Sequence, residues 1–213
     1  MSKSEAYVSF QGVQKSYDGE SLVVKDLNLD AQRGEFLTML GPSGSGKTTC
    51  LMMLAGFETV THGEIILDGT SINNVPPHKR NIGMVFQNYA LFPHMTVNEN
   101  LAFPLQVRKM SKSDIEDRVK SVLDMVQLGA FGNRRPMQLS GGQQQRALLA
   151  KTLMSPAKIF LLDEPCAALD PPAKEDFLKI VRQLADAGLS LLVSSHAWGE
   201  SLNNCDQLIV LDK

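Results

Sequence analysis

The run from Gly41 to Thr48 has the residue types and the spacing of a loop that binds polyphosphate. It reads Gly-Pro-Ser-Gly-Ser-Gly-Lys-Thr and matches the pattern G-x-x-x-x-G-K-[ST] in full. Its glycines let the backbone wrap around phosphates with the N–H groups pointing inward, and a following helix adds its positive end. A glycine-rich turn that contains lysine by chance is the alternative. It is disfavoured because an apolar run precedes the loop and a helix pattern follows it.

Lys47 is expected to reach the β- and γ-phosphates, and the Thr48 hydroxyl is expected to ligate Mg²⁺. Thr49 is expected to add a phosphate contact. The residues predicted to bind the phosphates are Gly41, Pro42, Ser43, Gly44, Ser45, Gly46, Lys47, Thr48 and Thr49.

Two adjacent acids form the second candidate centre. Asp163 and Glu164 follow the apolar run Ile159–Leu162, and α/β sheets place their ligands at such strand ends. Successive residues leave a strand in different directions, so one carboxylate can face Mg²⁺ while the other faces an attacking water. We assign Asp163 to the metal and Glu164 to the general base. Alone, the pair would also suit a solvated strand end, but the phosphate-binding loop in the same chain favours the functional interpretation.

The third candidate is Leu139-Ser140-Gly141-Gly142-Gln143. A serine before two glycines suits a capped helix N-terminus, which presents N–H donors and a hydroxyl to a phosphate. This run resembles the signature motif of ATP-binding cassette ATPases, and the resemblance covers nearly the whole chain. It implies a head-to-tail homodimer that encloses two ATP molecules with Mg²⁺. Ser140, Gly141, Gly142 and Gln143 would then contact the ATP held by the partner's phosphate-binding loop.

Three more positions match the family residue by residue. Gln87 matches the glutamine that senses Mg²⁺ and links to the membrane partner, so it is expected in the metal and catalytic sets. His196 matches the switch histidine at the γ-phosphate, and Asp170 matches the aspartate loop that crosses the dimer. By residue type alone, a single Gln is more often an ordinary loop residue and a single His a structural or surface residue.

An aromatic ring for the adenine base is the remaining expected contact. Tyr17 matches the family's stacking aromatic. Tyr7 and Phe10 are alternative rings, and packing on the surface of a sheet is the alternative role.

Residues 81–100 resemble the matching stretch of bacterial importer ATPases for polyamines, ferric iron and sugars. The resemblance implies a groove near Gln87–Phe103 for a short helix of a transmembrane permease, and a periplasmic solute-binding protein in the full system. Aromatic and Met residues are typical interface anchors, although packing within a helical insertion would use the same residues. The candidate anchors are Tyr89, Leu91, Phe92, Met95 and Phe103.

The last third departs from that importer group. It has Cys166-Ala-Ala-Leu-Asp170 where the group has Leu-Ser-Ala-Leu-Asp, and Ala197 where the group has Asp after the switch histidine. This part is more similar to cassettes of metal-ion importers. We hypothesise divergence, or an engineered junction, near Arg146. The chain also stops at Lys213, just after its last predicted strand, so we expect no C-terminal regulatory β domain, absent by nature or cut away.

Alternating strands and helices must position these motifs. Apolar runs predict strands at Glu35–Leu40, Gly63–Leu67, Gly83–Phe86, Ile159–Leu162, Leu189–Val193 and Leu208–Leu211. Helices are expected at Lys47–Ala55, Ser113–Gln127 and Pro172–Ala187, the second opened by a Ser113-x-x-Glu116 capping box.

These elements define one domain over residues 1–213. The fold class is α/β: a P-loop NTPase core with a mostly parallel sheet, and an antiparallel β subdomain formed by Tyr7–Phe10 and Val23–Leu29. A helical subdomain that leads into the signature is inserted at about residues 88–138.

Composition limits the function classes. Lys and Arg total 21 and Asp and Glu total 23, which argues against a surface that follows nucleic acid. The apolar runs fall short of the roughly 18 residues that a membrane span needs. The sequence therefore predicts a cytoplasmic ATPase, peripheral on the inner face of the cell membrane, that powers transport through partner subunits. A soluble cassette ATPase unconnected with transport, or a composite cassette that binds ATP with weak turnover, are the alternatives.

Overall fold

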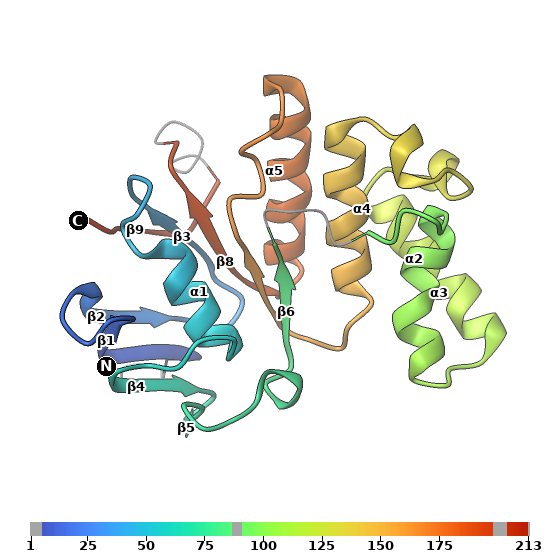
Figure 1. Cartoon of the computed structure of the whole chain (residues 1–213). Helices are drawn as coiled ribbons and strands as arrows, with labels where there is room; N and C mark the ends of the chain where they lie inside the picture. Colours follow the sequence, from blue (N-terminus) through green and yellow to red (C-terminus); the bar gives the residue numbers. More distant parts are fainter. Residues whose placement is uncertain (1–5, 87–90, 198–203, 213) are drawn as a thin grey trace.

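The structure is a computed structural model that describes residues 6–86, 91–197 and 204–212. Strands and helices alternate along most of this chain (Figure 1). In chain order the elements are β1 (Val8–Ser16), β2 (Leu22–Ala31), β3 (Phe36–Leu40), α1 (Lys47–Ala55), β4 (His62–Leu67), β5 (Thr70–Ser71), β6 (Ile82–Val85), α2 (Val97–Val107), α3 (Lys112–Met125), α4 (Gly141–Leu153), β7 (Ile159–Leu162), α5 (Pro171–Asp186), β8 (Ser190–Ser195) and β9 (Gln207–Val210). Short 3₁₀ turns occupy Pro77–Lys79, Gly129–Phe131 and Pro136–Gln138.

The described strands form two sheets of different character. One is parallel, with the order β6-β7-β8-β3-β9, and the other is antiparallel, with the order β2-β1-β4-β5. In the parallel sheet Leu40 pairs with Ser195, and Leu162 pairs with both Val85 and Val193. The carboxyl ends of these strands therefore lie at one edge, where the candidate residues follow them.

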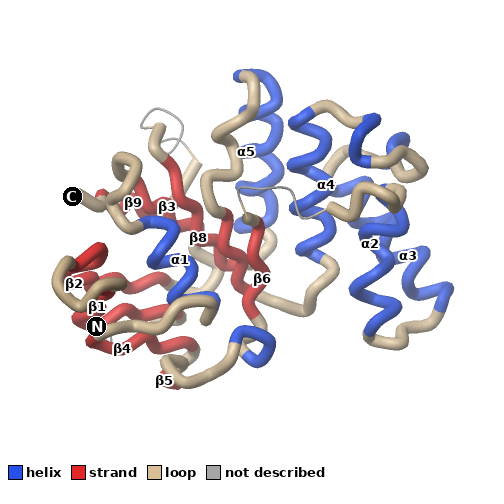
Figure 2. The backbone as a smooth tube through the Cα atoms, in the orientation of Figure 1, coloured by secondary structure: helices blue, strands red, loops and turns tan. Residues whose placement is uncertain are grey.

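The parallel sheet is buried on both faces, which explains its continuous apolar strands. In β7, Phe160 and Leu162 pack into a cluster with the helices α2–α5, whereas Ile159 and Leu161 pack on the opposite side. That opposite side holds α1 and the inner face of the antiparallel sheet. Helix α1 is thus enclosed between the two sheets, as the tube view also shows (Figure 2).

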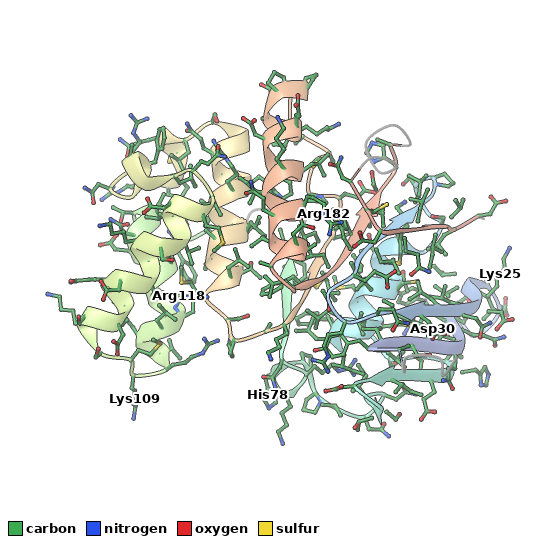
Figure 3. The ribbon with its side chains drawn as sticks, turned by 180° about the vertical axis from the view of Figure 1, so that it is seen from behind. Lys25, Asp30, His78, Lys109, Arg118 and Arg182 are labelled. Atoms are coloured by element: carbon green, nitrogen blue, oxygen red, sulfur yellow. The ribbon has the colours of Figure 1, made fainter. Side chains whose placement is uncertain are left out.

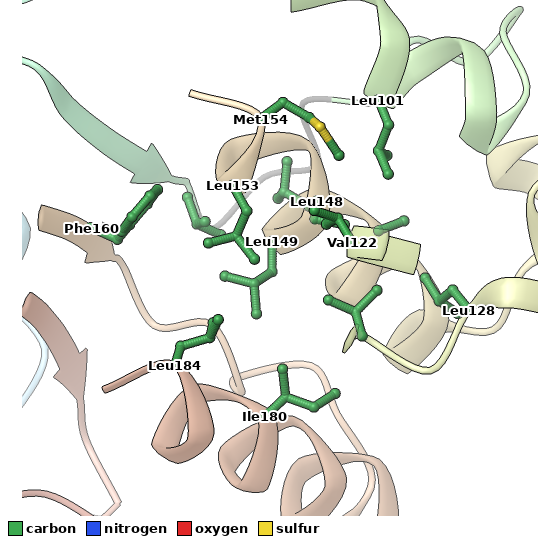
Figure 4. Packing of buried hydrophobic residues seen from close by; sticks show 14 of the residues in the cluster. Leu101, Val122, Leu128, Leu148, Leu149, Leu153, Met154, Phe160, Ile180 and Leu184 are labelled. Atoms are coloured by element: carbon green, nitrogen blue, oxygen red, sulfur yellow. The ribbon is translucent and has the colours of Figure 1, made fainter. Parts of the chain in front are cut away.

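Helices α2, α3 and α4 gather beyond β6 and α5 (Figure 1). Leu148 and Leu149 of α4 lie between Val122 of α3 and Ile180 of α5 in one continuous apolar cluster (Figure 4). This helical part is therefore packed on the core through α4 and α5, and α4 carries the candidate signature run at its start.

The structure confirms the predicted fold class and refines its boundaries. Helix α1 has the predicted limits, and both predicted N-terminal strands are longer than their apolar runs. Regular pairing joins Val8 to Ala31, and pairing with register shifts after Phe10 continues to Ser16. The predicted cap of α3 was wrong. Ser111 caps the helix by accepting a hydrogen bond from the Asp114 N–H, so Ser113 lies inside the first turn.

An ion pair ties β9, the edge strand, to α5 and β3. Asp206 accepts hydrogen bonds from the Phe36 N–H and from the Arg182 guanidinium, each at 2.9 Å. Figure 3 shows Arg182 on α5, viewed from behind. Burial alone would raise the pKa of Asp206, but these two hydrogen bonds outweigh it and hold the pKa below its ordinary value.

Candidate functional site

The loop between β3 and α1 is shaped by glycines that have no room for a side chain. A Cβ on Gly41 would collide with the Leu211 carbonyl and would lie 2.6 Å from the Ser45 hydroxyl. Gly46, directly before α1, has φ +88°, a conformation that favours glycine. The loop is therefore held tightly against the end of β9, and its turn delivers Lys47 as the first residue of α1.

Lys47 is buried at the centre of the site. Its side chain is 4% exposed, and its ammonium donates to the carbonyls of Gly41 and Pro42 at 2.7 and 2.9 Å. The same ammonium lies 3.8 Å from Glu164 Oε1. A buried cation at the start of a helix, enclosed by its own loop, is an arrangement that suits binding of an anion.

Asp163 is held by two hydroxyls from different elements. Thr48 Oγ1 lies 3.0 Å from each carboxylate oxygen, and Ser194 Oγ donates to Oδ1 at 2.7 Å. The Asp163 N–H bonds to the carbonyl of Val85, because β6 and β7 are neighbouring parallel strands. The carboxylate therefore faces the first turn of α1, which contains Thr48.

Glu164 leaves the strand in another direction. Its φ is +45°, which is uncommon for a residue other than glycine, and its N–H donates to Ser194 Oγ at 2.8 Å. Its carboxylate lies between two cationic or titratable groups: Lys47 on one side and His196 Nδ1, at 3.6 Å, on the other. Glu164 and His196 line the same cavity beside the end of β8. The positive φ of Glu164 thus directs its carboxylate away from that of Asp163, as the sequence predicts.

The residues present fit ATP and Mg²⁺ on two observations. The Ser45 hydroxyl is buried without a hydrogen-bond partner among the described residues, which leaves it available to a ligand of the loop. Thr48 and Asp163 supply oxygen atoms, the donors that Mg²⁺ prefers. Mg²⁺ usually takes one or two protein oxygens and completes its shell with phosphates and water, so a site with this pair of protein oxygens fits it.

The signature run caps α4 as the sequence predicts. Ser140 Oγ accepts from the Gln143 N–H at 3.3 Å, and Gln143 Oε1 accepts from the Ser140 N–H at 3.0 Å. A Cβ on Gly142 would lie 2.7 Å from Ala173 Cβ, so this glycine allows α4 to approach the start of α5. Helix α4 lies beyond β6 and α5 from α1 (Figure 1). Within one chain, the structure does not bring the signature to Lys47.

Two other predicted residues, Asp170 and Tyr17, lie in other parts of the described chain. Asp170 caps α5 by accepting from the Ala173 N–H at 2.9 Å. Tyr17 follows β1, is 59% exposed, and has the Lys15 ammonium 4.8 Å from its ring centroid. Gln87 and Tyr89 lie outside the described residues. The structure thus groups Lys47, Thr48, Asp163, Glu164 and His196 and leaves the other roles as predictions.

Ser194 is the residue of this site that the sequence analysis missed. It is fully buried in β8 and bonds to both acids of the pair. Its signal was its position, two residues before His196 on a strand that runs beside β7. A serine inside an apolar strand has to hydrogen-bond, and the acids at the end of the neighbouring strand were the nearest partners.

The fold and this site define a P-loop nucleotide-binding protein with a mostly parallel core sheet. A family model described as ABC transporter matches residues 24–167, more than half of the chain. The chain belongs to this family.

Known relatives and structures agree with this assignment. The spermidine/putrescine import ATP-binding protein PotA of Aliivibrio fischeri is 46% identical over 99% of this chain and 56% of its own length. The chain spans about half the length of the curated relatives it matches. The dimeric structure of MJ0796, a bacterial ABC transporter cassette, matches 96% of this chain and 94% of that one, with 33% identity and a TM-score of 0.85. A second dimeric MJ0796 structure, in a post-hydrolysis state bound to ADP and Pi, matches with a TM-score of 0.84 and the same identity.

Two predictions from the sequence, a junction near Arg146 and apolar runs too short to span a membrane, can be compared with these findings. The PotA relatives align over 99% of the chain, on both sides of Arg146. A junction near Arg146 stays a prediction, which separate comparisons of the two parts would test. No described helix has both the length and the apolar character needed to cross a bilayer.

Proposed function

We propose that this chain is the ATP-hydrolysing subunit of an importer. The observation that carries the proposal is the arrangement of Lys47, Glu164 and His196 beside the Thr48–Asp163 pair. A buried cation suited to phosphate, an oxygen pair suited to Mg²⁺ and a carboxylate suited to accept a proton lie at one sheet edge, which supports the proposal. The dimeric ATP-binding cassette of similar fold, bound to ADP and Pi, supports hydrolysis as the reaction.

Each residue has a proposed part in the reaction. Lys47 and the loop amides bind the β- and γ-phosphates, with Ser45 as an additional donor. Thr48 and Asp163 hold Mg²⁺, which when bound neutralises charge on the phosphate oxygens. Glu164 accepts the proton of the attacking water, and His196 lies beside it at the γ-phosphate. Gln87 completes the metal set, and Tyr17 stacks on adenine.

Dimer formation supplies the second half of each site. Ser140, Gly141, Gly142 and Gln143 reach the γ-phosphate of ATP bound by the partner, because a capped helix N-terminus is a phosphate-binding site. Asp170 lies near the dimer contact. The fold similarity to dimeric MJ0796 supports this arrangement. ATP binding therefore closes the homodimer, and hydrolysis followed by phosphate release reopens it.

The partners are proposed to be transmembrane permeases that dock near Gln87–Phe103, with a periplasmic solute-binding protein in the full system. Leu91, Phe92, Met95 and Phe103 are candidate contacts. Phe92, which precedes α2, and Phe103, which lies within α2, form an edge-to-face pair with centroids 5.2 Å apart. The subunit is then cytoplasmic and peripheral on the inner face of the membrane. The names of the relatives make polyamines the first substrate class to test.

We also propose that residues 1–213 form a single nucleotide-binding domain with a helical subdomain at about 88–138. Helices α2 and α3 fall within that range.

A phosphate-release assay on the purified chain tests the proposed function. Wild type should hydrolyse ATP only with Mg²⁺, and Lys47→Ala should lose ATP binding as well as hydrolysis. A chain that binds ATP with Mg²⁺ but releases no phosphate, alone or with permeases, would be a binding module instead. Import is tested separately, by uptake of labelled spermidine into vesicles that contain the complete transporter.

A further inference from the structure

One hydroxyl connects the two acids of the site. Ser194 Oγ donates to Asp163 Oδ1 at 2.7 Å and accepts from the Glu164 N–H at 2.8 Å. The side chain is fully buried in β8, and the two acids follow β7, the adjacent strand. Ser194 therefore contacts both groups without belonging to the loop that carries them.

The direction of these two hydrogen bonds is determined by chemistry. An amide can only donate, so the Glu164 N–H uses a lone pair of the hydroxyl oxygen. The hydroxyl has one proton, and the carboxylate of Asp163 is the acceptor in reach. The Ser194 proton is thus committed to Asp163, and a charge-assisted bond of this kind is stronger than a neutral one.

The two bonds fix different properties of the acids. For Asp163, Ser194 and Thr48 approach the carboxylate from two elements and set the orientation of its plane. For Glu164, the bond to the backbone N–H holds a residue whose φ is +45°. Because such a conformation persists only where its surroundings determine it, loss of this bond allows the Glu164 carboxylate to leave its place between Lys47 and His196.

We propose that Ser194 is a positioning residue that couples the Mg²⁺ ligand Asp163 to the general base Glu164. This inference rests on the proposed function of the same site. Ser194 acts through these two residues, because its hydroxyl sets where the metal-binding carboxylate and the base lie relative to each other.

The test compares Ser194→Ala, Ser194→Cys and Ser194→Thr with wild type and with Ser195→Ala as the matched control. Ser195 is the next residue of β8, and its hydroxyl accepts a hydrogen bond from the Ala197 N–H at 3.1 Å. Three measurements are made. Steady-state kinetics give kcat and KM for MgATP, electron paramagnetic resonance with a non-hydrolysable ATP analogue gives the affinity for Mn²⁺, and a fluorescent ATP analogue gives metal-free nucleotide binding.

Ser194→Ala should lower kcat about tenfold to a hundredfold and weaken Mn²⁺ binding about tenfold, by loss of orientation at both acids. Metal-free nucleotide binding should change less than about twofold, because the phosphate-binding loop is intact. Ser194→Thr, which keeps the hydroxyl, should recover most of both losses. Ser195→Ala should match wild type in all three measurements.

If Ser194→Ala does not fold, the similarly sized Ser194→Cys decides, because its weaker donor should produce the same losses in smaller degree. Variants that only melt earlier, with unchanged kcat and Mn²⁺ affinity, would show a merely structural serine and overturn the inference. A wild type that releases no phosphate would instead refute the proposed function, and the Mn²⁺ measurement would still report on the coupling.

Discussion

The ammonium of Lys47 lies 3.8 Å from Glu164 Oε1, although the two residues come from elements 117 positions apart in sequence. The buried cation thus faces both the phosphate-binding loop and the candidate base. Removing the charge of Glu164 should leave Lys47 free to bind phosphate while abolishing proton transfer.

Glu164→Gln should therefore retain MgATP and accumulate as a dimer. Loss of a positioned general base typically lowers the rate about 10²- to 10⁴-fold. Size-exclusion chromatography with and without ATP reads out the dimer, and a phosphate-release assay reads out the rate. A variant that stays monomeric with ATP, yet hydrolyses it at the wild-type rate, contradicts the role of Glu164.

Composite sites predict complementation between two inactive variants. Lys47→Ala destroys a chain's own phosphate-binding loop, and Ser140→Arg destroys the signature it offers to its partner. In an equal mixture, half of the dimers are mixed and each holds one intact site, so turnover should reach about a quarter of wild type. Each variant alone is the control. If the mixture is as inactive as its components, signature and phosphate-binding loop do not meet across a dimer.

Much of this site was predictable because its motifs are local. The glycines before Lys47 and the paired acids after Ile159–Leu162 each carry their function within a few residues, and both motifs took the predicted conformations. Ser194 was missed because its partners lie on a neighbouring strand, and only strand pairing shows that β7 and β8 are adjacent. The cap of α3 was misplaced by two residues because Ser111 and Ser113 both offer a hydroxyl at this point of the sequence, and the structure shows that Ser111 accepts the hydrogen bond from the Asp114 N–H.

The end of α1 depends on a buried arginine. Arg80 donates to the carbonyls of Met53 and Leu54 at 2.8 and 2.9 Å, and a Cβ on Gly56 would lie 2.6 Å from its Nε. Gly56→Ala should displace the guanidinium and lower the free energy of unfolding by about 2–4 kcal/mol, since buried carbonyls lose their donors.

Gly19→Ala is the matched control for that prediction. Gly19 also has a positive φ, of +81°, but nothing lies within 4 Å of the added Cβ. Gly19→Ala should lower the free energy of unfolding by about 1 kcal/mol, from backbone strain alone. Urea unfolding measures both changes, and equal losses in the two variants would contradict a special role for Arg80.

The thiol of Cys50 should resist alkylation in the native protein. Burial raises its pKa to about 12, so at pH 8 only about one thiol in ten thousand is ionised. Cys166 and Cys205 are partly exposed and should react first with iodoacetamide. Peptide mapping after timed labelling gives the order. Labelling of Cys50 as fast as the others would show that α1 opens readily between the two sheets.

The ionic anchor of β9, formed by Asp206 with Arg182 and the Phe36 N–H, should weaken in acid. Asp206 has a pKa below its ordinary value of about 3.9, so its contribution to stability is complete above that value and disappears as the pH falls through the lower native pKa. Asp206→Asn should therefore lower the urea midpoint at pH 7, and the difference from wild type should shrink near pH 3. Asp186→Asn is the control, because Asp186 contacts Arg182 but not the Phe36 N–H. A midpoint difference that does not change with pH would contradict the ionic anchor.

The crowding of Gly41 by the Leu211 carbonyl has a mechanical consequence. Strand β9 lies at the sheet edge, and its end supports the underside of the turn that is to cradle triphosphate. We therefore expect a displacement along this strand to reach the phosphate-binding loop through the contact between Leu211 and Gly41. Although β9 is an edge strand, a change in its position would therefore change the shape of the loop that is proposed to bind ATP.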